Sequence, residues 1–176
     1  MVKIKILKCR IQDLEAVVSF YNSVVLNLMN NINFPKWEYG VYPSAESVRK
    51  AIDKDTQFMC IENNEILGSF VLNGDPQGNY DCGDWENNLK NGEYLVIHTL
   101  ATNPNLHNRG IGKFMVKYCI DYAKDNGYKA IRLDVVPENI PAKRLYESLS
   151  FKFAGKKDLC RGIKEIPVFD LYEINF

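Results

Sequence analysis

The chain lacks an excess of charge of either sign. Its 176 residues include 22 Lys and Arg and 22 Asp and Glu, so the formal net charge is zero. Proteins that bind nucleic acid over a broad surface are usually strongly basic, so this balance argues against a nucleic-acid partner. A local site for a negatively charged ligand remains compatible with it.

Cysteine pairs with metal-binding or redox spacing are also lacking. The cysteines are odd in number, lie far apart and form no Cys-x-x-Cys pair: Cys9, Cys60, Cys82, Cys119 and Cys160. We therefore expect reduced thiols in a cytoplasmic protein, without a disulfide framework and without a metal site.

Long hydrophobic runs are missing as well. No apolar run is long enough to cross a bilayer. From Val2 to Lys5, apolar and charged side chains alternate, which does not match a signal peptide. The composition, with 46% hydrophobic and 25% charged residues, is that of a globular protein. We expect a single domain over residues 1–176, in the cytoplasm and without a membrane partner.

Hydrophobic periodicity divides the chain into strands and helices. Alternating or continuous apolar residues predict strands at 2–7, 57–62, 65–72, 93–102, 130–135, 152–159 and 168–174. Helical spacing predicts helices at 11–29, 44–54, 110–126 and 141–149. Ser44 is a plausible N-cap, Asn63-Asn64 a hairpin turn and Gly127 a helix stop. The order predicts an α/β (α+β) fold with a mixed, mostly antiparallel sheet of six to seven strands and helices on both faces.

The strongest local signal for chemistry is a glycine-containing turn between a strand and a helix, at Arg109-Gly110-Ile111-Gly112-Lys113. Such a turn exposes backbone N–H groups at the helix N-terminus, and these groups favour a phosphate. No third glycine completes the dinucleotide pattern G-x-G-x-x-G, and no Gly-Lys-Ser or Gly-Lys-Thr completes a Walker A motif. A turn that only packs the helix against the sheet is the alternative interpretation.

The chain around this turn is basic. Residues 103–133 contain six Lys and Arg and two Asp, a net charge of +4 in a neutral protein. A basic helix behind the turn suits a polyanionic ligand, although a solvated helix face gives the same pattern.

Two sequence blocks resemble the GCN5-related N-acetyltransferase (GNAT) superfamily. The acetyl-CoA loop of that family, Gln/Arg-x-x-Gly-x-Gly/Ala, is similar to His107-Asn108-Arg109-Gly110-Ile111-Gly112. The family segment that precedes this loop, Leu-Ala-Val-x-Pro, is similar to residues 100–104. A second family block, Asn-x-x-Ala-x-x-Leu-Tyr-x-x-x-Gly-Phe, is similar to residues 139–151. The resemblance covers residues 93–155. It departs from the pattern at His107, where Gln or Arg is usual, and at Ser150, where Gly is usual. If that last position needs a positive φ, Ser costs about 1 kcal/mol.

The resemblance implies a GNAT-like fold and the transfer of an acetyl group from acetyl-CoA to a primary amine, without a metal. Because the sequence shows no arrangement typical of a nucleophile, we expect direct attack by the amine rather than a covalent acyl-enzyme. The resemblance also implies that acetyl-CoA binds to Leu100, Ala101, Thr102, His107, Asn108, Arg109, Gly110, Ile111, Gly112, Lys113, Asn139 and Ala142. By analogy, the backbone N–H of Leu100 polarises the thioester carbonyl and the backbone of Thr102 pairs with pantetheine. For Asn139 the alternative role is to cap the next helix.

Two side chains are candidates for proton transfer. Tyr146 matches the family's acid position, which implies that its phenol serves the departing thiolate; packing against Phe151 is the alternative. Strand alternation places His98 on the same face as Leu100, and a pKa of about 6.5 suits a base. A purely structural histidine is the alternative, and Glu93 and Asp134 are weaker base candidates.

The acceptor is predicted from an acidic segment, residues 74–93, which holds five Asp and Glu against one Lys. It leads into the strand of His98, and Tyr80 and Trp85 in it could hold a cation. We therefore expect a small amine as acceptor, with cationic amines favoured. The alternatives are a solvated loop, a protein or peptide N-acetyltransferase, and an inactive CoA-binding regulatory module. Edge strands and the loop at residues 34–37 could serve a homodimer.

Overall fold

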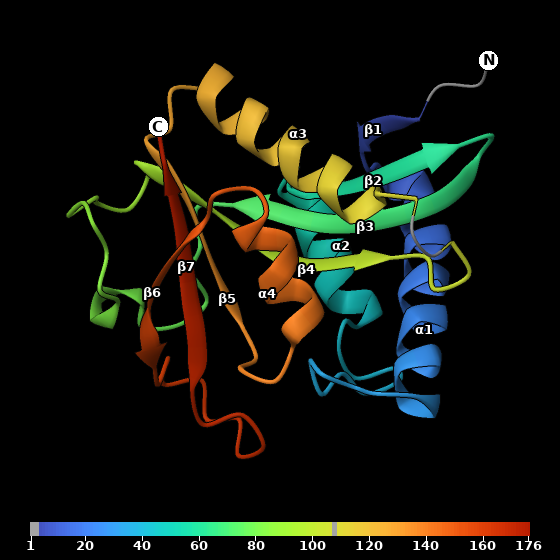
Figure 1. Ribbon diagram of the computed structural model, residues 1–176. Helices are drawn as coiled ribbons and strands as arrows, with labels where there is room; N and C mark the ends of the chain where they lie inside the picture. Colours follow the sequence, from blue (N-terminus) through green and yellow to red (C-terminus); the bar gives the residue numbers. More distant parts are fainter. Residues whose placement is uncertain (1–3, 107–108) are drawn as a thin grey trace. The chain divides into compact units, whose positions relative to one another are not determined.

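The computed structural model describes residues 4–106 and 109–176. The elements in chain order are β1 (Lys5–Lys8), the 3-10 helix η1 (Ile11–Asp13), α1 (Leu14–Asn30), α2 (Ala45–Asp53), β2 (Gln57–Glu62), β3 (Glu65–Asn73), the 3-10 helix η2 (Tyr80–Cys82), β4 (Tyr94–Thr102), α3 (Ile111–Asp125), β5 (Ala130–Val135), α4 (Ile140–Glu147), β6 (Lys152–Lys157) and β7 (Phe169–Asn175). Figure 1 shows these elements along the chain. The predicted helices and strands are all present with small shifts at their ends, and η2 is an addition within the segment predicted to be loop.

The strands form one sheet in the order β1-β2-β3-β4-β5-β7-β6. The pairs β1–β2, β2–β3, β5–β7 and β6–β7 are antiparallel, whereas β4 and β5 are parallel. The parallel pair is the one connected by a crossover through α3, as a βαβ unit requires. The predicted fold class, a mixed and mostly antiparallel sheet of six to seven strands, is confirmed with seven strands.

The chain divides into two compact units. The first contains Met1–Leu72 and His98–Tyr118, and the second contains Asn73–Ile97 and Cys119–Phe176. Both β4 and α3 therefore contribute residues to each unit. The single domain expected over residues 1–176 stays a prediction.

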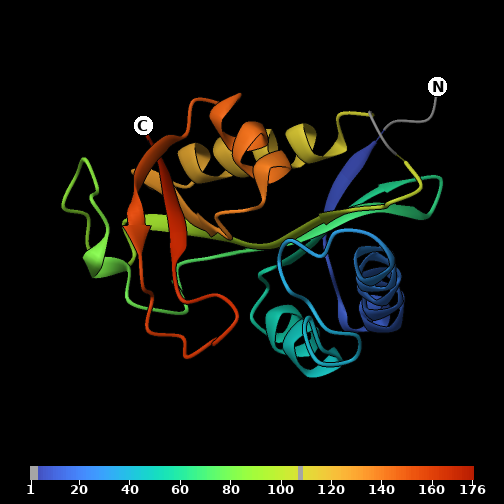
Figure 2. The same cartoon turned by 60° about the horizontal axis from the view of Figure 1, so that its bottom comes forward.

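In the first unit, helices cover both faces of the strands. α1 and α2 lie together on one face of β1, β2 and β3, and α3 lies on the other (Figures 1 and 2). Val17 of α1, Ile52 of α2 and Met59 of β2 share one buried cluster. The neighbouring Phe58 points to the opposite face, where its ring centroid lies 5.9 Å from that of Tyr118 in α3. Alternation along β2 thus separates two hydrophobic layers.

Three local signals of the sequence act as predicted. Asn63 and Asn64 have φ values of 51° and 64°, which match a hairpin turn with two left-handed residues. The Ser44 hydroxyl accepts a hydrogen bond from the Ser47 N–H at 3.1 Å and so caps α2. Gly127, with φ of 77°, follows the end of α3.

In the second unit, loops rather than helices cover one face of the strands. The buried cluster on this face combines Val96, Ala130 and Leu171 from the strands with Tyr80 and Leu159 from two loops. We call these loops the acidic loop (residues 74–93) and the β6–β7 loop (residues 158–168). Helices on both faces were predicted for the whole sheet, and here the apolar residues of the loops replace a helix.

Arg161 ties these two loops to each other and to β5. Its guanidinium forms two hydrogen bonds with the Asp134 carboxylate, at 2.8 and 2.7 Å. It also donates to the backbone carbonyls of Gln77 at 2.6 Å and Pro76 at 3.0 Å. A bidentate pair with additional carbonyl acceptors uses the planar donor geometry of arginine fully.

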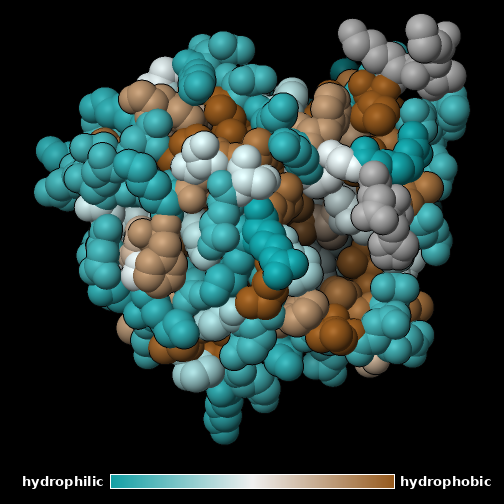
Figure 3. All heavy atoms as spheres, in the orientation of Figure 1, coloured by the Kyte–Doolittle hydropathy of each residue, from teal (hydrophilic) through white to brown (hydrophobic). Residues whose placement is uncertain are grey.

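Within the described ranges, no helix is long and apolar enough to cross a membrane. Hydrophilic residues make up most of the face seen in Figure 3, and hydrophobic residues appear there in separate small groups.

The backbone of Ser150 generates a prediction on stability. Ser150 has φ of 68°, the left-handed conformation that favours glycine, at the position where the family pattern has Gly. We expect Ser150→Gly to raise the free energy of unfolding by about 0.5–1 kcal/mol, measured by urea denaturation.

Ser148→Gly is the matched control. Ser148 has an ordinary helical φ of −64°, and its hydroxyl donates to the Leu145 carbonyl at 2.7 Å. This second substitution should lower stability. A loss of stability in both variants would contradict backbone strain at Ser150.

Candidate active site

The turn before α3 belongs to the first unit and is open. The Phe114 N–H donates to the Gly110 carbonyl at 2.9 Å, a hydrogen bond of the first turn of the helix. The preceding N–H groups, those of Ile111, Gly112 and Lys113, belong to the part of a helix whose N–H groups have no acceptors within the helix itself. Gly110 has φ of 70°, and a Cβ on it would meet nothing within 4 Å. This geometry fits an anionic ligand. The predicted contacts His107 and Asn108 lie outside the described residues.

Arg109 contributes less free positive charge than the sequence suggested. Its guanidinium lies 2.7 Å from the Glu62 carboxylate at the end of β2, and this hydrogen bond raises the pKa of Arg109. The exposed side chain of Lys113 follows on α3. Backbone N–H groups and Lys113 are thus the main features at this turn that favour an anion.

The residues predicted on β4 are also in the first unit. His98 is 9% exposed, Ala101 is buried, and Thr102 is exposed. Between His98 and Leu100, however, Thr99 has φ of 48°. The regular alternation used to place His98 and Leu100 on one face therefore does not continue through Thr99.

A buried polar network holds β4 at this irregular residue. The Tyr21 hydroxyl donates to the Thr99 carbonyl at 3.0 Å and accepts from the Gln57 amide at 3.3 Å. The same amide donates to the Ser69 hydroxyl at 2.8 Å. Burial raises the pKa of Tyr21, so its hydroxyl stays protonated and can donate. Sequence reasoning missed this network, because Tyr21 occupies an apolar position in the helical pattern and nothing marks it as a partner of β4.

Asn139 and Ala142 lie in the second unit, at the start of α4. The Asn139 carbonyl oxygen Oδ1 accepts from the Ala142 N–H at 3.2 Å. The capping role that was the alternative for Asn139 is thus present. It uses the acceptor end of the amide, while Nδ2 is the end with donor capacity for a ligand.

Tyr146 lies on α4, is 7% exposed, and packs edge-on against Phe151 with ring centroids 5.5 Å apart. Burial is the main cause that raises the pKa of Tyr146 well above its usual value, with smaller effects from Cys119 and Asp134. The hydroxyl therefore remains protonated over the working pH range. The packing role and the capacity to donate a hydrogen bond are present in the same side chain.

The weaker base candidates are both engaged in ion pairs. The Glu93 carboxylate pairs with Lys129, and this contact lowers the pKa of Glu93. Asp134 accepts from the Tyr80 hydroxyl at 2.6 Å in addition to its bidentate bond with Arg161. The lowered pKa of Glu93 is not that of a base poised to accept a proton near neutral pH, and both carboxylate oxygens of Asp134 are already hydrogen-bonded.

Lysines from distant parts of the chain neutralise much of the acidic loop. Asp84 lies 2.7 Å from Lys157, and Glu86 lies 2.8 Å from Lys152. With the pair of Glu93 and Lys129, the carboxylates of Asp84, Glu86 and Glu93 each have a lysine partner. These pairs weaken the basis for an attraction of cationic acceptors to this segment.

One aromatic residue of the acidic loop, Trp85, already contacts a cation. The Arg132 guanidinium lies 4.3 Å from the ring centroids of both Trp85 and Tyr94. Tyr80 is 2% exposed. Trp85 was predicted to offer a ring face to a cationic acceptor, and in this structure that ring contacts a cation of the chain itself.

The loop considered for dimerisation also has internal partners. The Trp37 indole lies edge-on to Tyr21 with centroids 6.2 Å apart, and its backbone carbonyl accepts from Asn33 at 2.7 Å. A homodimer stays a prediction. In the part of the chain that is described, no group of three or more His, Cys, Asp or Glu residues could hold a metal ion.

Comparison with protein families identifies the chain. The model of the acetyltransferase (GNAT) family matches residues 26–151. The chain therefore belongs to the GNAT acetyltransferase family, which confirms the resemblance found in the two sequence blocks.

Several curated proteins are similar in sequence. Identity is 34% over 110 residues to the uncharacterized N-acetyltransferase MJ1207 of Methanocaldococcus jannaschii, covering 62% of this chain and 43% of the relative. Identity is 27% over 106 residues to the L-methionine sulfoximine/L-methionine sulfone acetyltransferase of Salmonella typhimurium, and the match covers 58% of this chain and 61% of the relative. It is 25% over 143 residues to the L-amino acid N-acyltransferase MnaT of Escherichia coli, with 79% and 74% covered. The chain thus spans less than two thirds of the length of the first two.

Solved structures confirm the fold. A GNAT-family acetyltransferase of Streptococcus agalactiae superposes with a TM-score of 0.81 at 15% identity, covering 98% of this chain and 95% of the other. The Salmonella typhimurium protein yncA, whose structure contains acetyl-CoA as its cofactor, superposes with a TM-score of 0.70 at 15% identity, covering 98% and 94%.

Proposed function

We propose that this protein is a cytoplasmic N-acetyltransferase that moves an acetyl group from acetyl-CoA to the primary amine of a small molecule. The observation that carries the proposal is the open turn at Gly110, where β4 leads into the N-terminus of α3 in a chain of the GNAT family. A helix N-terminus with a glycine in the left-handed conformation and free space around it suits a phosphate group.

The chain offers acetyl-CoA mainly backbone donors. We assign the phosphates to the N–H groups of Ile111, Gly112 and Lys113, whose side chains need not take part. The N–H of Leu100 is proposed to polarise the thioester carbonyl, and the backbone of Thr102 to pair with the pantetheine arm. Asn139 would donate through Nδ2. The remaining predicted contacts, Ala101, His107, Asn108, Arg109 and Ala142, belong to the same proposal.

The transfer requires that the amine lose a proton and that the sulfur accept negative charge as the C–S bond breaks. His98 is proposed to take the amine proton, directly or through water. Tyr146 is proposed to donate a hydrogen bond to the sulfur. A phenol whose pKa is raised by burial is a weaker acid than a thiol, so hydrogen bonding rather than complete proton transfer is its main contribution.

Direct attack by the amine is supported by the environment of Cys119, a thiol whose charge affects the pKa of Tyr146. Cys119 on α3 is 0% exposed, and burial raises its pKa well above the usual value. A buried neutral thiol is a poor nucleophile, so a covalent acyl-enzyme at Cys119 is disfavoured.

The acceptor class is supported by relatives rather than by the acidic loop. Two of the similar proteins are named for acting on amino acids or amino-acid derivatives. Because Lys157, Lys152 and Lys129 pair with the acidic loop, a positive charge on the acceptor is a smaller advantage than the sequence suggested. We therefore propose a small amine and place L-amino acids first among the candidates.

The function is tested by a screen for acetyl-CoA-dependent thiol release. The panel contains L-amino acids, polyamines, neutral amines and short peptides, and we expect turnover with at least one small amine. Turnover with peptides alone would instead indicate a protein or peptide acetyltransferase. Binding of acetyl-CoA without turnover on any acceptor would indicate a regulatory module.

The phosphate assignment is tested at Gly110. Because Asn and Asp have similar shape and tolerate a positive φ better than most residues, Gly110→Asn and Gly110→Asp differ mainly in charge. We expect Gly110→Asp to bind acetyl-CoA at least about tenfold more weakly than Gly110→Asn, since a carboxylate would face phosphate. Calorimetric titration gives both affinities. Equal affinities in two folded variants would remove the phosphates from this turn.

The role of Tyr146 is tested by Tyr146→Phe, which deletes the hydroxyl and keeps the ring that packs on Phe151. We expect kcat to fall by about 10- to 100-fold while the dissociation constant of acetyl-CoA changes little. Tyr39→Phe, at a position that is 51% exposed, controls for loss of a tyrosine hydroxyl. A variant with the wild-type kcat would show that Tyr146 is only a packing residue.

The role of His98 is tested by the pH dependence of kcat/KM. A histidine base must be neutral, so the rate should fall toward acidic pH as the imidazole takes up a proton. His98→Gln cannot titrate and should lose this acidic limb together with most of its activity, whereas Tyr146→Phe should retain the limb. An acidic limb that persists in His98→Gln would leave His98 a structural residue.

A further inference from the structure

Two of the five cysteines lie outside the buried core. Cys82 in η2 is partly exposed and Cys160 in the β6–β7 loop is exposed, whereas Cys9, Cys60 and Cys119 are buried. Both accessible cysteines belong to the second unit. No step of the proposed acetyl transfer uses either of them.

The segments that carry these cysteines are in direct contact. The Asn79 N–H donates to the Leu159 carbonyl at 2.9 Å, which pairs the two loops three residues before Cys82 and one residue before Cys160. The Cys82 thiol donates to the Asn79 carbonyl at 2.9 Å and lies 3.7 Å from the carbonyl oxygen of Asp158. Asp158 is only two residues before Cys160, so the sulfur of Cys82 lies against the turn that carries the second thiol.

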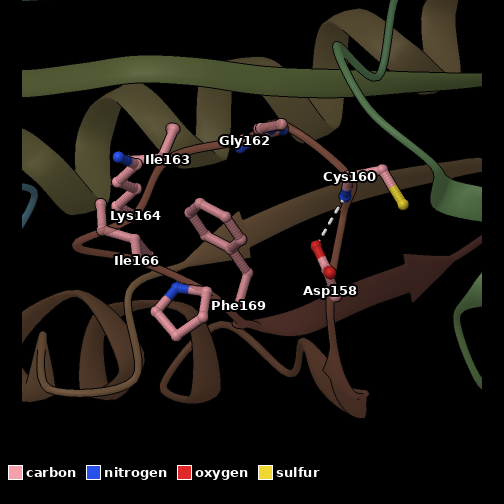
Figure 4. A pocket seen from close by; sticks show the side chains of 9 residues that line it. Asp158, Cys160, Gly162, Ile163, Lys164, Ile166 and Phe169 are labelled. Atoms are coloured by element: carbon pink, nitrogen blue, oxygen red, sulfur yellow. Dashed lines mark hydrogen bonds between the residues drawn. The ribbon is translucent and has the colours of Figure 1, made fainter.

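The turn directs the Cys160 side chain toward the acidic loop. Cys160 has φ of 55°, and its N–H donates to the Asp158 carboxylate at 2.8 Å. The β6–β7 loop lines a pocket of about 360 Å³, and Figure 4 shows the Cys160 sulfur pointing away from it, toward the green ribbon of the acidic loop. The two thiols also interact electrostatically: after burial, proximity to Cys160 is among the causes that raise the pKa of Cys82.

We propose that Cys82 and Cys160 form a reversible disulfide that joins the acidic loop to the β6–β7 loop when a disulfide oxidant such as oxidised glutathione is present. The thiolate of the exposed Cys160 attacks one glutathione sulfur, forms a mixed disulfide and releases one glutathione thiolate. Cys82 then attacks the Cys160 sulfur and releases the second. The two cysteine protons end on the two glutathione thiols, and the glutathione disulfide is reduced as the protein dithiol is oxidised.

The positions of the two cysteines favour this disulfide over others in the chain. Cys82 ends the short 3-10 helix η2 and Cys160 lies in the β6–β7 loop, so neither is in a strand of the sheet. Small backbone shifts toward disulfide geometry cost less in such segments than in a strand. The other three thiols are buried in the hydrophobic layers and are inaccessible to an oxidant. Oxidation would add a covalent link beside the Arg161 contacts that already connect the same loops.

The proposal is tested on the full chain by treatment with oxidised glutathione, followed by blocking of free thiols and peptide mapping by mass spectrometry. We expect one intramolecular disulfide between the peptides of Cys82 and Cys160, a monomer on a non-reducing gel, and full reversal by dithiothreitol. The other three cysteines should be recovered as free thiols. A stable glutathione adduct on Cys160 without the disulfide, or a link between two chains, would overturn the proposal.

Two variants separate the roles of the thiols. Cys82→Ser should stop at the Cys160 glutathione adduct, whereas Cys160→Ser should leave Cys82 largely unmodified, because the more buried thiol reacts slowly. Cys160 is exposed, so Cys160→Ser should fold normally. If Cys82→Ser does not fold, Cys160→Ser still tests the proposal. Modification of Cys82 in Cys160→Ser as fast as disulfide formation in the wild type would contradict the proposed order of attack. The readout is independent of acetyl transfer, so failure of the proposed function leaves it unaffected.

Discussion

The hydrogen bond from Tyr21 to the Thr99 carbonyl is the contact on which the geometry of β4 depends. Thr99 leaves the extended conformation inside a strand, and the Tyr21 hydroxyl supplies a hydrogen-bond partner to its partly buried carbonyl. Leaving a fully buried carbonyl without a partner costs about 1–3 kcal/mol, which sets the upper limit of this contribution. Gln57 supports the tyrosine hydroxyl from β2, so three elements fix one peptide group. The directions of His98 and Leu100 follow from that peptide, which makes a buried helix residue a determinant of the proposed active site.

The second unit is stabilised differently, by charged and aromatic contacts between segments far apart in the sequence. Arg132 lies between two aromatic rings, and Arg161 holds two loops on Asp134. These contacts explain why the face formed by Val96, Ala130 and Leu171 needs no covering helix. They also engage charged groups and aromatic rings that the sequence alone presents as available to a ligand. A preference for cationic acceptors therefore has less support than the sequence suggested.

The features predicted correctly are those encoded within a few residues. Asn63-Asn64 defines its turn, Gly127 ends its helix, and the spacing around Gly110 marks the turn at α3, because each needs only local backbone properties. The features that sequence reasoning missed depend on pairing across the chain. Neither the contact of Asp84 with Lys157 nor that of Tyr21 with Thr99 has a periodicity or a motif that could announce it. The same limit explains why alternation failed at Thr99, whose left-handed backbone no adjacent glycine signals.

The two tryptophans of the chain are distributed one to each unit. Trp37 lies beside Tyr21 in the first unit, and Trp85 lies under the Arg132 guanidinium in the second. Indole fluorescence depends on nearby charge, so the two residues have distinct surroundings that change when their own unit loses its packing. The protein therefore carries an intrinsic optical probe in each unit, and replacing one tryptophan at a time would allow the loosening of the two units to be followed separately.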